Sequence, residues 1–303
     1  MLDVREHDRA IARTLPVDLL GDAATPADNV IVWPRPHLGK DFTRWCLARG
    51  ASSLRPGGAL WCAARKAKGA LGLTDEIGRM MGEVDVVGRS RGYRLMRGRR
   101  GPAFDDSYAR EVLATRYTIE DPALPGLVLH SAPGVFSRRE LDGGTRQLIE
   151  HAAAHAPPPS TVLDLGCGIG PLALWAATRW TDARVLAVDS NVLAVALARD
   201  NASRHGLQPR VVVEASDGMP TPPTARARAF EGAVDLALVN PPTHADPETL
   251  RRFADDLKRW LRPGGLAMLV VNRGGRMTQQ LAASGARVEA HAYARFTILH
   301  ATW

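Results

Sequence analysis

The sequence predicts an α/β protein whose main domain is a mostly parallel sheet flanked by helices, preceded by a shortened copy of the same unit. Three observations support this prediction. Short apolar runs alternate with helix-like segments throughout the C-terminal half, as they do in βα units. A glycine-rich turn follows the first of these runs. Two segments near the N-terminus recur 207 residues later in the same order.

Length and composition allow two domains. The chain has 303 residues, of which 45% are hydrophobic, so it can bury one or two sizeable cores. It contains no run of about eighteen apolar residues, and its N-terminus has no signal-peptide pattern, so a cytoplasmic protein without a membrane segment is expected. Cys46, Cys62 and Cys167 lie far apart and form no ligand cluster, so neither disulfides nor a structural metal site are expected.

The charge of the chain is basic and unevenly distributed. The formal net charge is +7, which attracts polyanions over a Debye length. Six arginines fall within twelve positions that contain no acid: Arg89, Arg91, Arg94, Arg97, Arg99 and Arg100. Such a run can grip the phosphates of a nucleic acid, although it can also be an ordinary solvated edge.

An internal repeat divides the chain. Val32–His37 (VWPRPH) aligns with Val239–His244 (VNPPTH), and the two LRPGG segments that begin at Leu54 and Leu261 have the same offset of 207. Each copy reads as strand, loop, helix, turn and strand. The first copy begins too late to contain the glycine-rich turn, and it has Trp33 in the position of Asn240. We therefore expect a truncated, non-catalytic domain over residues 1–117 and the catalytic domain over residues 118–303.

The glycine-rich turn has the context of a cofactor loop. The apolar run 161–165 precedes it, the helix-like segment 171–177 follows it, and its glycines are Gly166, Gly168 and Gly170. Glycines allow positive φ and close approach of a ligand, and the N–H groups at the start of a helix suit a polar group. A second run, 184–188, ends in Asp189, whose carboxylate can accept hydrogen bonds from both hydroxyls of a ribose.

The acid before the turn separates two kinds of cofactor. A dinucleotide site has the spacing GxGxxG, whereas this turn is GxGxG with Asp164 in front of it. Asp164 can bind a ligand ammonium group or order the loop, and a cofactor with an amino-acid part has such a group whereas NAD has none. A third run, 210–213, leads to Asp217, which is placed to accept from an adenine amino group or to cap a neighbouring element.

A fourth apolar run, 234–239, ends in Asn240, Pro241 and Pro242. In an open α/β sheet this end lies beside the glycine-rich turn. Because the prolines fix φ and lack N–H groups, the Asn240 side-chain oxygen and the Pro241 carbonyl remain as fixed acceptors. Two such acceptors can orient the lone pair of an exocyclic amine without a strong base. A rigid turn is the structural alternative. The chain is then expected to end in an antiparallel hairpin of residues 286–288 and 294–301.

Together these motifs resemble a known family. VLDLGCGIGPLAL, AVDSN, LVNPPTH, LRPGG and LVVNR, with PGVFS from Pro133 and LDGG from Leu141, are similar to the ribosomal RNA guanine-N2 methyltransferases RsmC and RlmG. The resemblance covers about residues 117–303. It implies a Rossmann-like class I methyltransferase fold with a seven-stranded sheet, S-adenosylmethionine as cofactor, and ribosomal RNA or a ribosomal subunit as partner.

The resemblance also implies roles for particular residues. The segment around Phe136 and Asp142 would close over the cofactor, and Asn240 with Pro241 would orient the amine. The predicted catalytic residues are Asn240, Pro241 and Pro242, and the predicted cofactor-binding residues are Asp164, Gly166, Cys167, Gly168, Gly170, Asp189, Ser190, Asn191, Asp217, Asn240, Phe136 and Asp142.

Two departures from the family leave the acceptor open. Thr243 stands where family members commonly have an aromatic residue that would stack on the base, and the N-terminal copy is short. Transfer to guanine N2 of 16S ribosomal RNA is the first interpretation. The alternatives are another amino acceptor, in 23S ribosomal RNA, tRNA, DNA or a protein glutamine, and a catalytically silent RNA-binding factor.

Overall fold

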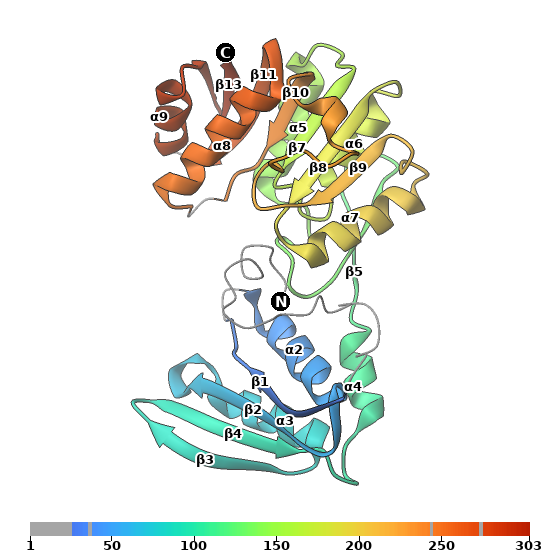
Figure 1. Ribbon diagram of the computed structural model, residues 1–303, viewed down its shortest axis with the longest axis vertical. Helices are drawn as coiled ribbons and strands as arrows, with labels where there is room; N and C mark the ends of the chain where they lie inside the picture. Colours follow the sequence, from blue (N-terminus) through green and yellow to red (C-terminus); the bar gives the residue numbers. More distant parts are fainter. Residues whose placement is uncertain (1–25, 36–37, 243–244, 273–274) are drawn as a thin grey trace. The chain divides into compact units, whose positions relative to one another are not determined.

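A computed structural model describes residues 26–35, 38–242, 245–272 and 275–303. The chain divides into two compact units (Figure 1). Of the described residues, 26–117 and 132–136 form one unit, and 118–131 and the residues after 136 form the other. We call them the N-terminal and the C-terminal unit. Among the helices of the described residues, none is both long and apolar enough to cross a bilayer.

The C-terminal unit is built on a seven-stranded sheet with the order β12-β13-β11-β10-β7-β8-β9. The pairs from β11 through β9 are parallel, whereas β13 is antiparallel to both β11 and β12. The strands are β7 (Thr161–Leu165), β8 (Arg184–Asp189), β9 (Val211–Ala215), β10 (Val234–Val239), β11 (Leu261–Asn272), β12 (Arg287–Ala292) and β13 (Phe296–Thr302). The predicted mostly parallel sheet with a terminal antiparallel hairpin is confirmed.

Helices cover both faces of this sheet. Alternate strand residues point to opposite sides, so each strand contributes side chains to both helix layers. Leu163 and Leu165 belong to a core with Trp260 of α8 and Leu281 of α9, whereas Asp164 between them bonds to α6 on the other face. The helices are α5 (Gly143–His155), α6 (Pro171–Arg179), α7 (Val192–Arg204), α8 (Pro247–Trp260) and α9 (Arg276–Ala283). A short hairpin, β5 (Tyr117–Glu120) with β6 (Val128–Ser131), and the 3₁₀ turn η3 (Arg228–Phe230) complete the elements.

The N-terminal unit is a four-stranded sheet with helices on one face. Its order is β1-β2-β4-β3, with β1 parallel to β2 and the other pairs antiparallel. Its core joins Leu60, Cys62 and Met96 of the sheet to side chains of the three α-helices that lie within the described residues. The elements are β1 (Ala27–Val32), α2 (Lys40–Ser52), β2 (Leu54–Arg65), η2 (Lys66–Lys68), α3 (Ala70–Met81), β3 (Val84–Ser90), β4 (Tyr93–Arg99) and α4 (Asp106–Leu113).

The sequence repeat reappears in the strand register. Ala27 pairs with Leu54 in the β1–β2 pair, and Val234 pairs with Leu261 in the β10–β11 pair, so each partner moves by the same 207 positions. The register shift after the first pair is also common to both. The order β1-β2-β4-β3 corresponds strand by strand to β10-β11-β13-β12. The four strands of the N-terminal unit therefore copy the second half of the larger sheet, and its described residues contain no counterpart of the half that carries the glycine-rich turn.

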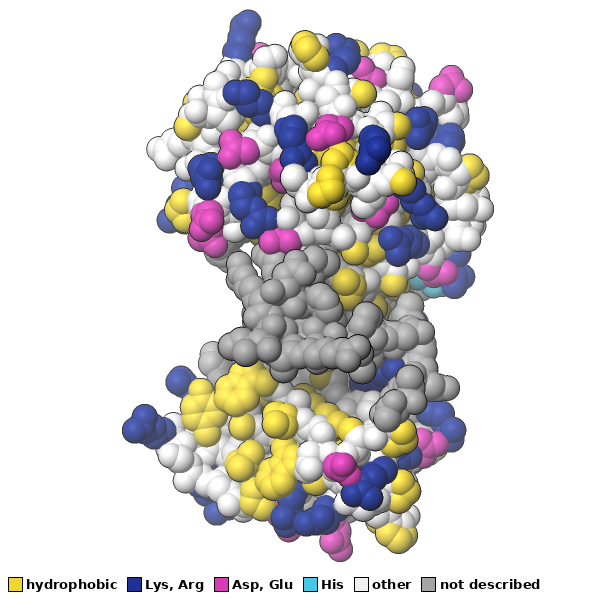
Figure 2. Space-filling model, viewed as in Figure 1, with side chains coloured by type: hydrophobic (Ala, Val, Ile, Leu, Met, Phe, Trp, Pro, Cys, Tyr) yellow, Lys and Arg dark blue, Asp and Glu magenta, His cyan; other side chains and the backbone are white. Residues whose placement is uncertain are grey.

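One face of the N-terminal sheet has no helix over it within the described residues. Ile31 is 77% exposed and Trp33 is 64% exposed, whereas Leu238, which corresponds to Ile31, is buried in the C-terminal unit. In that unit α5 packs on β11 and β13, and the described residues of the N-terminal unit include no counterpart of α5. We call this surface the open face. It contains Ile31, Trp33, Trp61, Arg65, Tyr93, Leu95, Arg97 and Arg99. Figure 2 shows hydrophobic side chains gathered on the N-terminal unit with Lys and Arg around them.

The division of the chain differs from the predicted boundary at one place. The sequence places everything after residue 117 in the second domain, but residues 132–136 group with the N-terminal unit. This segment contains Phe136, which is 70% exposed. The turn residues after Tyr117 indicate where the chain changes direction, but they carry no information about the unit to which a later segment belongs.

Candidate active site

The candidate site lies at one edge of the seven-stranded sheet. β7 is the neighbour of both β8 and β10, and all three strands run in the same direction. Their carboxyl ends therefore meet at one edge, which is where open α/β sheets bind ligands. Residues 166–170 follow β7, Asp189 ends β8, and Asn240 follows β10. The predicted arrangement of these three segments side by side is confirmed.

The glycines between β7 and α6 have two different surroundings. Gly166, Gly168 and Gly170 all have positive φ, at 84°, 55° and 92°. A Cβ atom added at Gly166 or Gly168 would have no atom within 4 Å, so the backbone there is open to a ligand. A Cβ atom at Gly170 would lie 2.6 Å from Leu174 Cδ1 and 3.4 Å from Ala198 Cβ. The first two glycines therefore expose the loop, and the third allows α6 and α7 to pack closely.

Replacing Gly170 by alanine is expected to destabilise the C-terminal unit by about 2–3 kcal/mol, because left-handed backbone strain adds to the overlap with Leu174. Gly206 is a matched control, since its φ is 67° and an added Cβ would meet nothing within 4 Å. Gly206→Ala should therefore lose only about 1 kcal/mol from backbone strain. Urea unfolding of both variants measures the difference, and equal losses would show that the packing around Gly170 is unimportant.

Asp164 orders the start of α6. The residue is fully buried, and its Oδ2 accepts a hydrogen bond from the Ala173 N–H at 2.9 Å. Its Oδ1 has no hydrogen-bond partner among the described residues. Burial is the main cause that raises the pKa of Asp164 to about 8; the hydrogen bond from the Ala173 N–H opposes this shift, and the nearby Asp189 carboxylate adds to it. The unused oxygen is the atom that a ligand ammonium group could engage.

The raised pKa of Asp164 predicts a pH-dependent stability. Between about pH 4 and about pH 8 the folded state holds a proton on Asp164 that the unfolded state has released. The free energy of unfolding therefore falls as pH rises through this range. The variant Asp164→Asn replaces the carboxyl group by a neutral amide that does not titrate. Its stability relative to the wild type should increase by ~1.4 kcal/mol per pH unit across that window. Chemical unfolding at pH 5, 6, 7 and 8 tests this, and a constant difference would mean that Asp164 is ionised in the fold.

The carboxylate of Asp189 closes the glycine-rich loop against β8. Its Oδ2 accepts from the Gly168 N–H and its Oδ1 accepts from the Asn191 N–H, each at 2.7 Å. The Gly166 and Cys167 N–H groups both donate to the Val188 carbonyl. Cys167 is buried, and burial raises the pKa of its thiol well above the usual value. It therefore packs as a neutral side chain beneath the loop.

Three further residues of the predicted cofactor set have contacts within the protein. The side chain of Asn191 caps α7 by accepting from the Leu193 and Ala194 N–H groups. Asp217 is paired with Arg252, which approaches its carboxylate at 3.1 Å and donates to its carbonyl at 2.6 Å. Ser190 is half-buried beside Asp189. Their roles toward a cofactor remain predictions.

The amide of Asn240 has a fixed orientation. Its Nδ2 donates to Asp142 Oδ2 and to Thr145 Oγ1, each at 2.9 Å. Because a carboxylate only accepts hydrogen bonds, the nitrogen must face Asp142, and Oδ1 is left to accept from a ligand. Asp142 is itself the N-cap of α5, where its Oδ2 also accepts from the Thr145 N–H. The structure thus brings the LDGG segment to Asn240, 98 residues away.

The structure adds to the predicted site and leaves part of it undescribed. Sequence reasoning missed Thr145, although Asp142 and Thr145 stand at the spacing of a helix cap, which is a detectable signal. Pro241 is buried and Pro242 is exposed. Thr243 and His244 lie outside the described residues.

The sheet order, the glycine-rich loop after β7, the acid at the end of β8 and the Asn-Pro-Pro segment after β10 define a class I methyltransferase fold. The model of the methyltransferase small domain family matches residues 126–300. The chain belongs to this family.

Curated relatives and one solved structure agree with this membership. The ribosomal RNA small subunit methyltransferase C of Chromohalobacter salexigens is 30% identical over 273 residues, 87% of this chain and 74% of the relative. That of Actinobacillus succinogenes is 32% identical over 215 residues, 70% of this chain and 58% of the relative. In general the chain spans about half the length of the curated relatives it matches. The 16S rRNA N2 methyltransferase RsmC of T. thermophilus has a TM-score of 0.78 and 25% identity, covering 94% of this chain and 75% of that one.

Proposed function

We propose that this protein is an S-adenosylmethionine-dependent methyltransferase that methylates guanine N2 in 16S ribosomal RNA. The observation that carries the proposal is the Asn240 amide, whose nitrogen is held by Asp142 and Thr145 so that its oxygen is the remaining acceptor. A ribosomal RNA substrate implies that the enzyme acts in the cytoplasm.

The residues around the glycine-rich loop fit the proposed cofactor. The backbone at Gly166 and Gly168 is open to a ligand, and the buried Asp164 Oδ1 lacks a partner among the described residues. Asp189, at the end of β8, would accept hydrogen bonds from the ribose hydroxyls, and Asp164 would face the amino-acid part. When bound, S-adenosylmethionine supplies a methyl group activated by its sulfonium.

Asn240 and Pro241 would orient the acceptor. The lone pair of an exocyclic amine is delocalised into its ring, so the amine is a weak nucleophile. If Asn240 Oδ1 and the Pro241 carbonyl each accept one amine hydrogen, the lone pair is held in a single direction. Positioning of this kind can contribute up to roughly 7–11 kcal/mol without a strong base. The Asp142 and Thr145 contacts keep the amide oxygen in place before the substrate arrives.

The relatives favour guanine in the small ribosomal subunit as the acceptor. The curated relatives are named ribosomal RNA small subunit methyltransferase C, and the T. thermophilus RsmC was solved with AdoMet and guanosine. Purified chain with labelled methyl donor should therefore modify 16S ribosomal RNA or the 30S particle, and mass spectrometry of nucleosides should find N2-methylguanosine. Labelling of 23S ribosomal RNA, tRNA, DNA or a protein glutamine instead would identify a different acceptor.

The open face of the N-terminal unit is the surface that we assign to RNA contact. Trp33 and Tyr93 lie with ring centroids 6.3 Å apart, Arg65 stacks over Tyr93, and Arg97 stacks over Trp61. Exposed aromatic rings with arginines between them suit unpaired bases and phosphates. The arginine run does not act as one group, because Arg100 donates to the Ser52 and Leu54 carbonyls and so has a structural role.

Replacing Arg97 and Arg99 together by alanine is expected to weaken RNA binding about tenfold or more. Each lost phosphate contact should also lower the slope of log K against log salt by roughly 0.7–0.9. Arg110→Ala is the matched control, since Arg110 is exposed on α4, whose side chains pack on the opposite face of the same sheet. Filter binding at several salt concentrations measures both quantities. An unchanged slope in the double variant would remove the open face from the RNA-binding surface.

A further inference from the structure

Four of the nine histidines of the chain gather at one place in the C-terminal unit, away from the glycine-rich loop. His291 pairs with Ile298 across the β12–β13 hairpin, and Glu289 pairs with His300. Directly opposed residues point to the same face, and so do residues two positions apart. His291 and His300 therefore lie on one face of the hairpin, where α5 packs and contributes His151 and His155.

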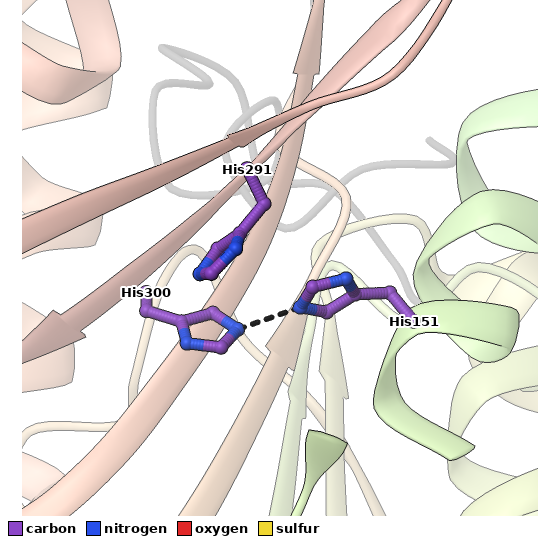
Figure 3. A group of neighbouring side chains, drawn as sticks. All are labelled: His151, His291 and His300. Atoms are coloured by element: carbon purple, nitrogen blue, oxygen red, sulfur yellow. Dashed lines mark hydrogen bonds between the residues drawn. The ribbon is translucent and has the colours of Figure 1, made fainter. Parts of the chain in front are cut away.

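Three of these rings converge on a common point (Figure 3). One ligating nitrogen from each of His151, His291 and His300 can be chosen so that all lie within 4.8 Å of one another. The Nε2 atoms of His151 and His300 are 2.7 Å apart. The Nε2 atom of His291 is buried and has no hydrogen-bond partner among the described residues, because Glu289 Oε1 is 3.8 Å away. A buried nitrogen without a partner is a costly arrangement that needs an explanation.

A neighbouring hydroxyl gives one ring the orientation of a metal ligand. His151 Nδ1 lies 2.6 Å from the Tyr293 hydroxyl. If Nδ1–H donates to that oxygen, the lone pair of His151 is on Nε2, the atom that faces His300 and His291. Metal-binding histidines commonly hold their second ring nitrogen in a hydrogen bond of this kind.

We propose that His151, His291 and His300 bind one Zn²⁺ ion through their imidazole nitrogens, with the fourth position left to water. A Zn–N distance of about 2.0–2.1 Å places two nitrogens of a tetrahedral site roughly 3.3 Å apart. The Nε2 atoms of His151 and His300 must therefore separate by about 0.6 Å, and His291 must move toward them. Before the metal binds, the proton between the two Nε2 atoms is on His300. When the metal takes its place, His300 carries its proton on Nδ1 instead, and His300 is only partly buried.

The site would join α5 to the terminal hairpin. Nothing in this assignment requires methyl transfer, since the three ligands are separate from the residues assigned to the acceptor and the cofactor. Bound metal should nevertheless stabilise the same helix whose first residues hold Asn240, because Asp142 caps α5 and His151 lies in its last turns. The sequence offered no sign of the site, because residues 151, 291 and 300 have no ligand-motif spacing.

The test is a metal titration of the tag-free, metal-stripped chain. Co²⁺ is expected to bind with 1:1 stoichiometry and to give the intense visible absorption of a tetrahedral site, which Zn²⁺ abolishes by displacement and Mg²⁺ does not. Zn²⁺ should also raise the Tm of the protein. His291→Ala and His300→Ala are each expected to weaken binding by at least about 100-fold. His155→Ala is the matched control, because its ring stacks on His151 at 4.3 Å without joining the three ligands.

A measurement on the wild-type chain does not depend on how the variants fold. In long-range ¹H–¹⁵N spectra of the histidine rings, Zn²⁺ should shift one nitrogen resonance each of His151, His291 and His300 and leave those of His130 and His205 unchanged. Zn²⁺ that fails to bind at submillimolar concentration, shifts other rings, or binds equally well to His291→Ala and His300→Ala would overturn the proposal.

Discussion

Asn240→Ala is expected to lower kcat for methyl transfer by about 10²–10³-fold while cofactor affinity stays nearly unchanged. In the proposed function the substitution removes the acceptor for the amine, and loss of one preorganised hydrogen-bonding group at a reacting centre has effects of this size. Single-turnover assays with 16S ribosomal RNA measure the rate, and calorimetry with S-adenosylmethionine measures the affinity. Methylation at the wild-type rate would exclude Asn240 from the reaction.

Two further variants test the orientation of the amide rather than its presence. Asn240→Asp keeps the shape of the side chain but replaces the NH₂ group by oxygen, which faces the Asp142 carboxylate as a like charge and cannot donate to it. We expect it to lose as much activity as the alanine variant. Thr145→Val removes one of the two acceptors of Nδ2 and should lose about tenfold. A fully active Asn240→Asp enzyme would mean that the Asp142 contact does not orient the amide.

The same assay separates the enzyme from the catalytically silent alternative. A silent RNA-binding factor would show no transfer in the wild-type chain, and its cellular function would survive Asn240→Ala. The proposed enzyme instead predicts that this variant binds RNA and cofactor but leaves 16S ribosomal RNA unmethylated.

Asp189→Ala is expected to weaken S-adenosylmethionine binding by at least about 100-fold. The carboxylate holds the Gly168 and Asn191 N–H groups, and in the proposed function it also accepts from the ribose hydroxyls; hydrogen bonds to a charged group contribute about 1.5–3 kcal/mol each. The variant therefore loses both the ordered loop and the ligand contacts. Calorimetric titration with the cofactor checks the affinity.

Asp182→Ala provides the matched control for this prediction. Asp182 is an exposed acid that precedes β8, so it lies at the amino end of the strand that Asp189 ends. Removing it changes the net charge equally but leaves the cofactor edge of the sheet intact, and binding should be unchanged. Comparable losses in the two variants would indicate a general effect of charge rather than a contact made by Asp189.

Sequence patterns predict those parts of the fold whose contacting residues lie close together in the chain. The run 161–165, its glycines and the helix from Pro171 form one βα unit, so the period of the apolar residues and the turn chemistry were sufficient to predict it. The repeat was equally reliable, because strand register follows the apolar pattern, and the same pattern at an offset of 207 produces the same register.

Contacts between distant segments were outside the reach of these patterns. The resemblance implies that Asp142 closes over the cofactor, and this remains a prediction, whereas its contact with the Asn240 amide and the second contact from Thr145 are seen only in the structure. Arg100 was grouped with the phosphate-binding arginines, and the structure has it bonded to two carbonyls. The predicted boundary at residue 117 places residues 132–136 in the second domain, whereas in the structure they group with the N-terminal unit.

The amino-acid order by itself determined the α/β class, the glycine-rich loop, the strand-end acids and the duplicated unit, because each depends on side chains within a few turns or strands of one another. Tertiary structure alone decided which atom of Asn240 is available, that no helix of the described residues covers one face of the N-terminal sheet, and that three histidines from α5 and the terminal hairpin converge. These properties depend on how helices pack on a sheet, and packing joins side chains whose separation along the chain carries no periodic signal.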